Sequence, residues 1–260
     1  MSNLVQYLGQ QSSRPSPIIF GNFPVAEWLV NKGGRDFFED FHSLNASSSP
    51  YLYDVSDNNA TIEIVASEKK GLVRLAPTAD DNEECWMLGD DKGTICEIAA
   101  EAGKVGFEAR IRTSSIADNT NGIVFGLYEE GLAVGDDIIQ ADDTSALSDK
   151  NYIVFRTLQA DGDGLDIAYN TNGGGGETIH LELAQTLVAD TWYNVGGYFD
   201  GDDTLKFYVN GVKVGTDLSI GATNFPNALE LQFALAAKVG SANTLNFDCD
   251  WIRICQEFVD

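Results

Sequence analysis

Short runs in which apolar and polar residues alternate dominate the chain from Asp36 onward. The clearest run is residues 192–215, WYNVGGYFDGDDTLKFYVNGVKVG. Its alternation stops after Phe199, resumes at Leu205 and turns at Asn210-Gly211. A period of two is typical of strands with one buried face, and Asn-Gly is a strong hairpin signal. The run therefore predicts two strands joined by an acidic turn, then an Asn-Gly turn into a third strand.

The same reasoning predicts strands over most of the chain after Asp36. No long segment with the helical period separates them, so βαβ units are not expected. Many short antiparallel strands in one domain favour a sandwich or a barrel, and we predict an all-β, two-sheet antiparallel sandwich. The predicted strands are residues 61–66, 71–76, 84–89, 94–98, 104–113, 121–129, 151–159, 164–169, 178–184, 191–199, 204–210, 212–215, 230–236 and 245–255. The predicted turns include 90–93, 161–164 and 210–211.

The first 35 residues have a different pattern. Prolines at 15, 17 and 24 predict an extended arm, and residues 24–34, PVAEWLVNKGG, predict a short helix. We therefore expect an arm over residues 1–35 and a sandwich over residues 36–260. So apolar an arm either packs on its own domain or docks on another protein. Its expected anchors are Ile18, Ile19, Phe20, Phe23, Trp28 and Leu29.

The formal net charge of −24 is spread unevenly along the chain. Residues 1–35 carry a net charge of +2, which leaves −26 on the remainder. Such a surface repels phosphate backbones and anionic lipid, so neither nucleic acid nor membrane is an expected partner. The start of the chain, MSNLVQYLGQQ, does not resemble a signal peptide. We expect Cys85, Cys96, Cys249 and Cys255 to be free, buried thiols in a reducing compartment.

Catalytic motifs are not found. His42 and His180 are the only histidines, no Gly-x-Ser-x-Gly elbow occurs, and cysteine and histidine are scattered. We therefore expect a protein that is not an enzyme and has no required cofactor. Two acidic turns are weak candidates for calcium, since hard cations bind oxygen ligands. They contain Asp161 and Asp163 in one turn, and Asp200 and Asp202 in the other. Asp and Gly are also the ordinary residues of hairpin turns.

Three stretches resemble known proteins. TWYNVGGYFDGDDTLKFYVNGVKVG resembles the paired strands of the concanavalin A-like, laminin-G-like jelly rolls, and LNFDCDWIRICQ at 245–256 resembles the closing strand of laminarinase-like members. Residues 103–130, GKVGFEARIRTSSIADNTNGIVFGLYEE, resemble tailed-phage virion proteins of this fold. The resemblance implies a concanavalin A-like jelly roll. Laminarinase-type enzymes carry Glu-x-Asp-x-x-Glu on one strand, a motif absent here, where Glu177 and Glu182 fall on opposite strand faces.

The phage resemblance, the thiols and the apolar arm on an acidic body together favour a non-enzymatic capsid decoration (cement) protein. It would be made in the host cytoplasm, lie on the virion surface and bind the major capsid protein through its arm. A homo-oligomer, by analogy a trimer, is expected. The alternative is a lectin-like module that binds a glycan.

Overall fold

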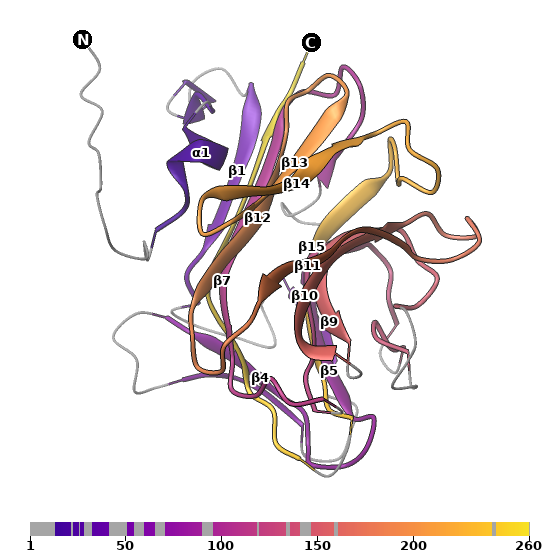
Figure 1. Cartoon of the computed structure of the whole chain (residues 1–260). Helices are drawn as coiled ribbons and strands as arrows, with labels where there is room; N and C mark the ends of the chain where they lie inside the picture. The colour runs from indigo at the N-terminus through magenta and orange to yellow at the C-terminus, as the bar shows by residue number, and fades with distance from the viewer. Residues whose placement is uncertain are drawn as a thin grey trace.

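The computed structural model is a sandwich of two antiparallel sheets, with a short helix near the N-terminus (Figure 1). The all-β jelly-roll prediction is confirmed. No helix in the described part of the chain is long and apolar enough to cross a membrane. The structure describes residues 14–21, 23–25, 27–28, 33–41, 51–54 (backbone only), 60–65, 71–89, 96–118, 120–133, 136–140, 147–158, 161–240 and 243–259.

The first sheet, sheet A, has β7 and β16 at its centre. Its strands follow the spatial order β14 (Val212–Ser219), β13 (Thr204–Val209), β12 (Tyr193–Phe199), β7 (Val105–Thr113), β16 (Phe247–Glu257), β4 (Val73–Ala76) and β3 (Thr61–Ile64). β1 (Gly34–Glu39) also pairs with β16, beyond the point where β4 ends. The last strand of the chain therefore holds together strands from both ends of the sequence.

The second sheet, sheet B, packs face to face with sheet A. Its order is β11 (Thr178–Thr186), β10 (Asp161–Asn170), β9 (Tyr152–Leu158), β8 (Gly122–Glu129), β15 (Glu230–Lys238), β5 (Glu84–Gly89) and β2 (Tyr51–Asp54), with β6 (Cys96–Glu97) also paired to β15. The core between the sheets is built from one face of each strand and contains many aromatic rings, as expected for sheet-on-sheet packing. These rings include Phe107, Phe125, Phe155, Phe207 and Phe233. All four cysteines are buried and free, as predicted.

The turns between strands test the sequence predictions directly. Asn210 and Gly211 both have positive φ, 51° and 74°, so the predicted Asn-Gly hairpin turn is confirmed. The turn predicted at 161–164 is wrong, because Asp161 already pairs with Leu158 and begins β10. The turn predicted at 90–93 lies outside the described residues. Two strands, β1 and β2, were not predicted.

The arm differs from the extended segment expected before residue 24. Residues Pro17–Phe20 form the helix α1, with Pro17 at a first-turn position where its missing N–H costs nothing. A helical turn also follows Pro24, whose carbonyl accepts hydrogen bonds from the backbone N–H groups of Glu27 and Trp28. β1 begins at Gly34, so the expected boundary between residues 35 and 36 falls inside a paired strand.

Candidate functional site

The outward face of sheet A carries a hollow that sequence reasoning did not predict. A row of cross-strand neighbours on this face runs from Asp36 through Cys255 and Gly106 to Tyr198. Gly106 has no side chain, so the sheet is indented at the middle of the row. A Cβ atom placed there would lie 3.0 Å from Ile19 Cγ2 and 3.0 Å from Phe23 Cε2. The indentation is therefore filled by the N-terminal arm.

Side chains of the arm and of the sheet form a small hydrophobic cluster over this hollow. Ile19 is fully buried, and Phe20, Phe23 and Trp28 are each less than a tenth exposed. The Phe23 ring meets those of Trp28 and Tyr198 edge-on, with centroids 5.6 Å and 6.1 Å apart. Burying four large side chains on one strip of sheet contributes stabilisation of about 1.5–3 kcal/mol each before the cost of ordering the arm.

A buried carboxylate fixes the start of the arm. Glu108 is fully buried on β7; its Oε2 accepts the Ser16 backbone N–H at 2.7 Å and its Oε1 accepts the Ser16 hydroxyl at 2.5 Å. Burial raises the pKa of Glu108 to about 7, although the two Ser16 hydrogen bonds and the neighbouring Arg253 act to lower it. The arm is thus attached to the sheet by the two Ser16–Glu108 hydrogen bonds at its start and by aromatic packing farther along.

The structure shows where most of the predicted partner-binding anchors lie. Ile19, Phe20, Phe23 and Trp28 pack on their own domain, which was one of the two alternatives for the arm. Ile18 is 48% exposed, and Leu29 lies outside the described residues. A partner could reach the buried anchors only if the arm left the sheet, so docking through them stays a prediction.

The predicted calcium residues do not converge on a common point. Within the described ranges, no group of three or more His, Cys, Asp or Glu side chains has the geometry of a metal site. Asp200 instead accepts hydrogen bonds from Lys206 Nζ at 2.8 Å and Thr204 Oγ1 at 2.9 Å. Desolvation acts to raise the pKa of Asp200, but these hydrogen bonds outweigh it and lower the pKa. The ammonium group of Lys206 therefore takes the position on this carboxylate that a cation would need.

Asp161 and Asp163 lie at the start of β10 rather than in a turn. Asp161 is exposed, and its pKa is raised by desolvation, by a hydrogen bond with Asp163 and by the nearby charges of Asp163, Asp166 and Asp118. Asp161 and Asp163 thus share a hydrogen bond, but within the described residues no third acidic group joins them in the geometry of a metal site.

The outward face of sheet B is covered by a segment that we call the cover, comprising the described residues 131–133, 136–140 and 147–148. Small residues on neighbouring strands, among them Gly126, Ala168, Ala234 and Ala236, leave room for it. Onto them pack Leu132, Ile138, Ile139 and Leu147, each 3% exposed or less. This face is therefore a second, smaller hydrophobic core rather than an open sheet.

An ion pair attaches the cover to the sheet. Lys238 is fully buried, and its Nζ donates to the Ile139 carbonyl at 2.7 Å and to Asp137 Oδ2 at 3.1 Å. Glu84 accepts the backbone N–H groups of Ile138 and Ile139 at 3.0 Å and 3.1 Å, and lies 3.5 Å from Lys238 Nζ. Burial raises the pKa of Glu84 to about 8, against the opposing effect of Lys238.

A second polar group lies on the same face. Glu177 binds Arg156 Nη2 at 2.6 Å and accepts the Tyr152 hydroxyl at 3.1 Å, and both Arg156 and Glu177 side chains are nearly buried. The Tyr152 ring stacks on Tyr128 with centroids 5.8 Å apart. The carboxylates of Glu84 and Glu177 hold the sheet face together through these hydrogen bonds and ion pairs. The sequence did not predict these buried ion pairs. The one feature that could have indicated them is charge at the ends of apolar strands, as in Glu83-Glu84 before CWML.

Comparison with known proteins agrees with this architecture. Residues 133–257 match the family model described as the Concanavalin A-like lectin/glucanases superfamily, as the sequence motifs predicted. No curated protein sequence matches the chain.

Several solved structures share the fold at low sequence identity. A peanut lectin bound to a 9-residue peptide superposes with a TM-score of 0.58 at 11% identity, covering 87% of this chain and 99% of the lectin. The protein of unknown function SO2946 from Shewanella oneidensis MR-1 gives 0.57 at 12% identity, with 91% and 95% covered. A glycoside hydrolase family 16 endo-glucanase from Bacteroides ovatus gives 0.57 at 12% identity, with 84% and 99% covered. Because lectins and glycosidases share this fold, the fold by itself does not separate binding from catalysis.

Proposed function

Since the chain has the concanavalin A-like fold, we propose that it is a non-catalytic member of that group, a structural protein of a virion surface that binds and stabilises the major capsid protein shell. The observation that carries the proposal is that the chain covers its own sheets. The cover occupies the outward face of sheet B, and the arm occupies the hollow of sheet A. Ligand and substrate sites are concave and open to solvent, whereas side chains of the same chain fill these parts of the two faces.

The charge supports the same role. A net charge of −24 on a chain of 260 residues keeps neighbouring copies and particles apart in solution. The likeness of residues 103–130 to tailed-phage virion proteins points to the particle, and the free thiols are consistent with assembly in a reducing host cytoplasm. The arm, as docked, would contact the shell through its exposed side, which among the described residues carries Ile18.

The test is capture of the shell by purified protein from the native source, with bound proteins identified by mass spectrometry. Ile18→Asp should reduce recovery of one abundant shell protein, because it places a charge on the exposed side of α1. Val188→Asp is the matched control, since Val188 is similarly exposed, at 56% against 48%, and belongs to the loop before β12. Circular dichroism would verify that both variants are folded. The proposal fails if no shell protein is recovered by the unaltered chain, or if both variants bind equally well.

A second candidate is carbohydrate binding, and the comparisons favour it specifically, because the structures of this fold include lectins. A glycan array with the unaltered chain tests it. Binding of a glycan, released by free sugar, together with no recovery of a shell protein would make this the better description.

A further inference from the structure

Beneath the cover, a buried lysine lies between two carboxyl groups. Lys238 of β15 stands directly opposite Glu84 of β5 in the antiparallel pair, and its side chain is fully buried. Its Nζ is 3.1 Å from Asp137 Oδ2 of the cover and 3.5 Å from Glu84 Oε2. A fully buried lysine is rare in proteins. The sheet and the cover therefore bring an amine and two carboxyl groups within contact distance of one another.

Other lysines of the described chain that form ion pairs lie in a different environment. Their side chains are between 26% and 42% exposed; these lysines are Lys104, Lys150, Lys206 and Lys213. Water therefore solvates their ammonium groups and keeps them charged. At Lys238 the surroundings are apolar, and burial of this kind disfavours the charged forms of both an amine and a carboxyl group.

The protonation of Glu84 suits proton transfer. Burial raises the pKa of Glu84 to about 8; the charge of Lys238 acts against this shift, and the charge of Asp137 adds to it. Glu84 is therefore a neutral carboxyl group at pH 7. A neutral carboxyl group has one oxygen that donates a proton and one that accepts, so it can act as acid and as base in the same step.

We propose that Lys238 Nζ and Asp137 Cγ condense to an amide, an intramolecular isopeptide bond, and that Glu84 relays the proton. The ammonium first gives one proton to the Asp137 carboxylate, which leaves a neutral amine beside a neutral carboxyl group. The lone pair of Nζ then attacks Cγ and forms the C–N bond. Glu84 takes a second proton from the nitrogen and gives its own proton to the hydroxyl on Cγ. The C–O bond breaks, one water leaves and Glu84 is regenerated, so no oxidant or other reactant is consumed.

The geometry favours this condensation. Nζ already contacts Oδ2, Cγ is one bond farther, and reactants held about 3–3.5 Å apart in the correct orientation react with effective molarities of about 10⁵–10⁸ M. Asp137 is 44% exposed, so the released water has a route to solvent. The new amide N–H can keep the contact that Nζ makes with the Ile139 carbonyl at 2.7 Å. The bond would attach the cover covalently to β15, between residues 101 positions apart in the chain.

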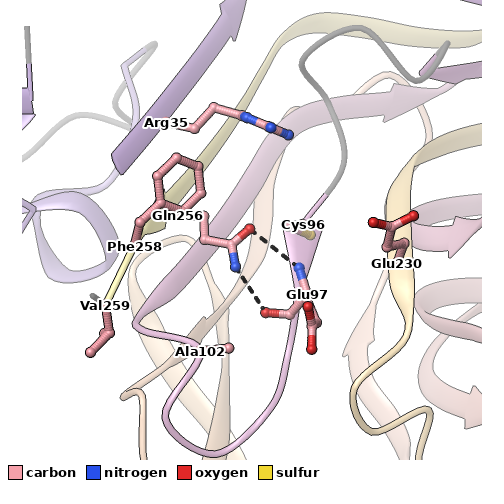
Figure 2. Close-up of a pocket in the computed structure, with 8 residues that line it drawn as sticks. All are labelled: Arg35, Cys96, Glu97, Ala102, Glu230, Gln256, Phe258 and Val259. Atoms are coloured by element: carbon pink, nitrogen blue, oxygen red, sulfur yellow. Dashed lines mark hydrogen bonds between the residues drawn. The ribbon is translucent and has the colours of Figure 1, made fainter. Parts of the chain in front are cut away.

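A control carboxyl group lies on the same strand as Lys238. A pocket of about 300 Å³ opens at one edge of the sandwich, and its lining includes Arg35, Glu97 and Glu230 but no lysine (Figure 2). Glu230 begins β15, the strand that ends at Lys238. Glu230→Gln therefore removes a carboxyl group from β15 without altering the cover or the groups that react.

The test is intact-mass spectrometry of the denatured chain, followed over time after synthesis, together with tryptic mapping. We expect the unaltered chain to become lighter by one water and to give a branched peptide that joins Asp137 to Lys238 and is not cleaved after Lys238. Asp137→Ala should keep its full mass, and Asp137→Asn should still react but lose ammonia in place of water. Glu84→Gln should slow the reaction by about a hundredfold or more, whereas Glu230→Gln should react at the unaltered rate.

The proposal is overturned if trypsin still cleaves the whole unaltered population after Lys238 following prolonged incubation. It is also overturned if Glu84→Gln reacts as fast as the unaltered chain, or if the loss of water persists in Asp137→Ala. Circular dichroism would verify that the variants are folded, and Asp137→Ala alters only a half-exposed side chain. The proposal does not depend on the virion role or on glycan binding, so its failure would leave both of those candidates standing.

Discussion

The packing of the arm on its own domain can be tested at Gly106. Gly106→Val adds a branched side chain where even a Cβ atom would lie 3.0 Å from both Ile19 and Phe23. Overpacking of this kind costs typically about 1–3 kcal/mol, and the arm is the mobile partner because the strand is paired on both sides. Since about 1.4 kcal/mol changes an equilibrium tenfold, the open form of the arm should become roughly 5- to 150-fold more populated.

Cys255 reports the opening directly. It is fully buried in the arm cluster and is the cross-strand neighbour of Gly106. Alkylation followed by peptide mass spectrometry gives a labelling rate for each cysteine separately. In Gly106→Val the alkylation rate of Cys255 should rise by the same factor, roughly 5- to 150-fold, because only the open form of the arm exposes this thiol. Cys85 and Cys249, buried between the sheets, should not change and serve as internal controls.

Gly221→Val is the matched control for the substitution itself, because a Cβ atom there meets only Ser219 Oγ, at an ordinary 3.5 Å. The reasoning is refuted if Cys255 labels at the unaltered rate in Gly106→Val. It is equally refuted if all the cysteines accelerate together, because that result would mean global destabilisation rather than release of the arm.

Three further predictions concern charged groups. Between about pH 4.5 and 7 the folded chain holds a proton on Glu108 that the unfolded chain has lost, so the stabilisation from this group is complete below pH 4.5 and is lost as the pH rises through 7. The free energy of unfolding in urea should therefore fall between pH 5 and pH 8, and Glu108→Gln should remove up to about 3 kcal/mol of that fall. An equal fall in the variant and the unaltered chain would contradict this reasoning. Relative to the chain without the isopeptide bond, Lys238→Met should cost about 1–3 kcal/mol in urea unfolding at pH 7, because it leaves the buried Ile139 carbonyl and Asp137 without their donor, while Glu84, whose pKa is raised to about 8, is neutral; a cost below about 1 kcal/mol would show that the lysine is dispensable. Calcium or EDTA should leave the melting temperature unchanged, because the ammonium group of Lys206 already binds the Asp200 carboxylate. A calcium-dependent rise in melting temperature that Asp200→Asn abolishes would reverse this conclusion.

The fold was predictable because its signals are local. Alternation along β12 and β13 and the positive-φ turn at Asn210-Gly211 are each visible within a few residues. β1 was missed because Phe37 and Phe38 stand next to each other and conceal the alternation: Phe37 packs on the core, whereas Phe38 is 49% exposed.

The sites were less predictable because they are assembled from distant segments. The hollow at Gly106 exists only once β7 lies between β12 and β16, and the sequence near Gly106 carries no sign of Ile19 above it. Glu84 and Lys238 are likewise far apart in the chain and meet across β5 and β15. The opening lined by Arg35 and Glu230 depends on the same kind of assembly, because β1 and β15 belong to different sheets.

The position of β16 has a consequence for how the protein is made. β16 pairs with β7 on one side and with β4 and β1 on the other, so sheet A cannot close before β16 has been synthesised. At 5–20 residues per second, β1 waits roughly 10–40 s for its partner after leaving the ribosome. Throughout that interval the apolar side chains of the arm have no finished surface to cover. Docking of β1 and the arm therefore follows the synthesis of β16, and loss of that strand would leave these N-terminal segments without a surface to pack on.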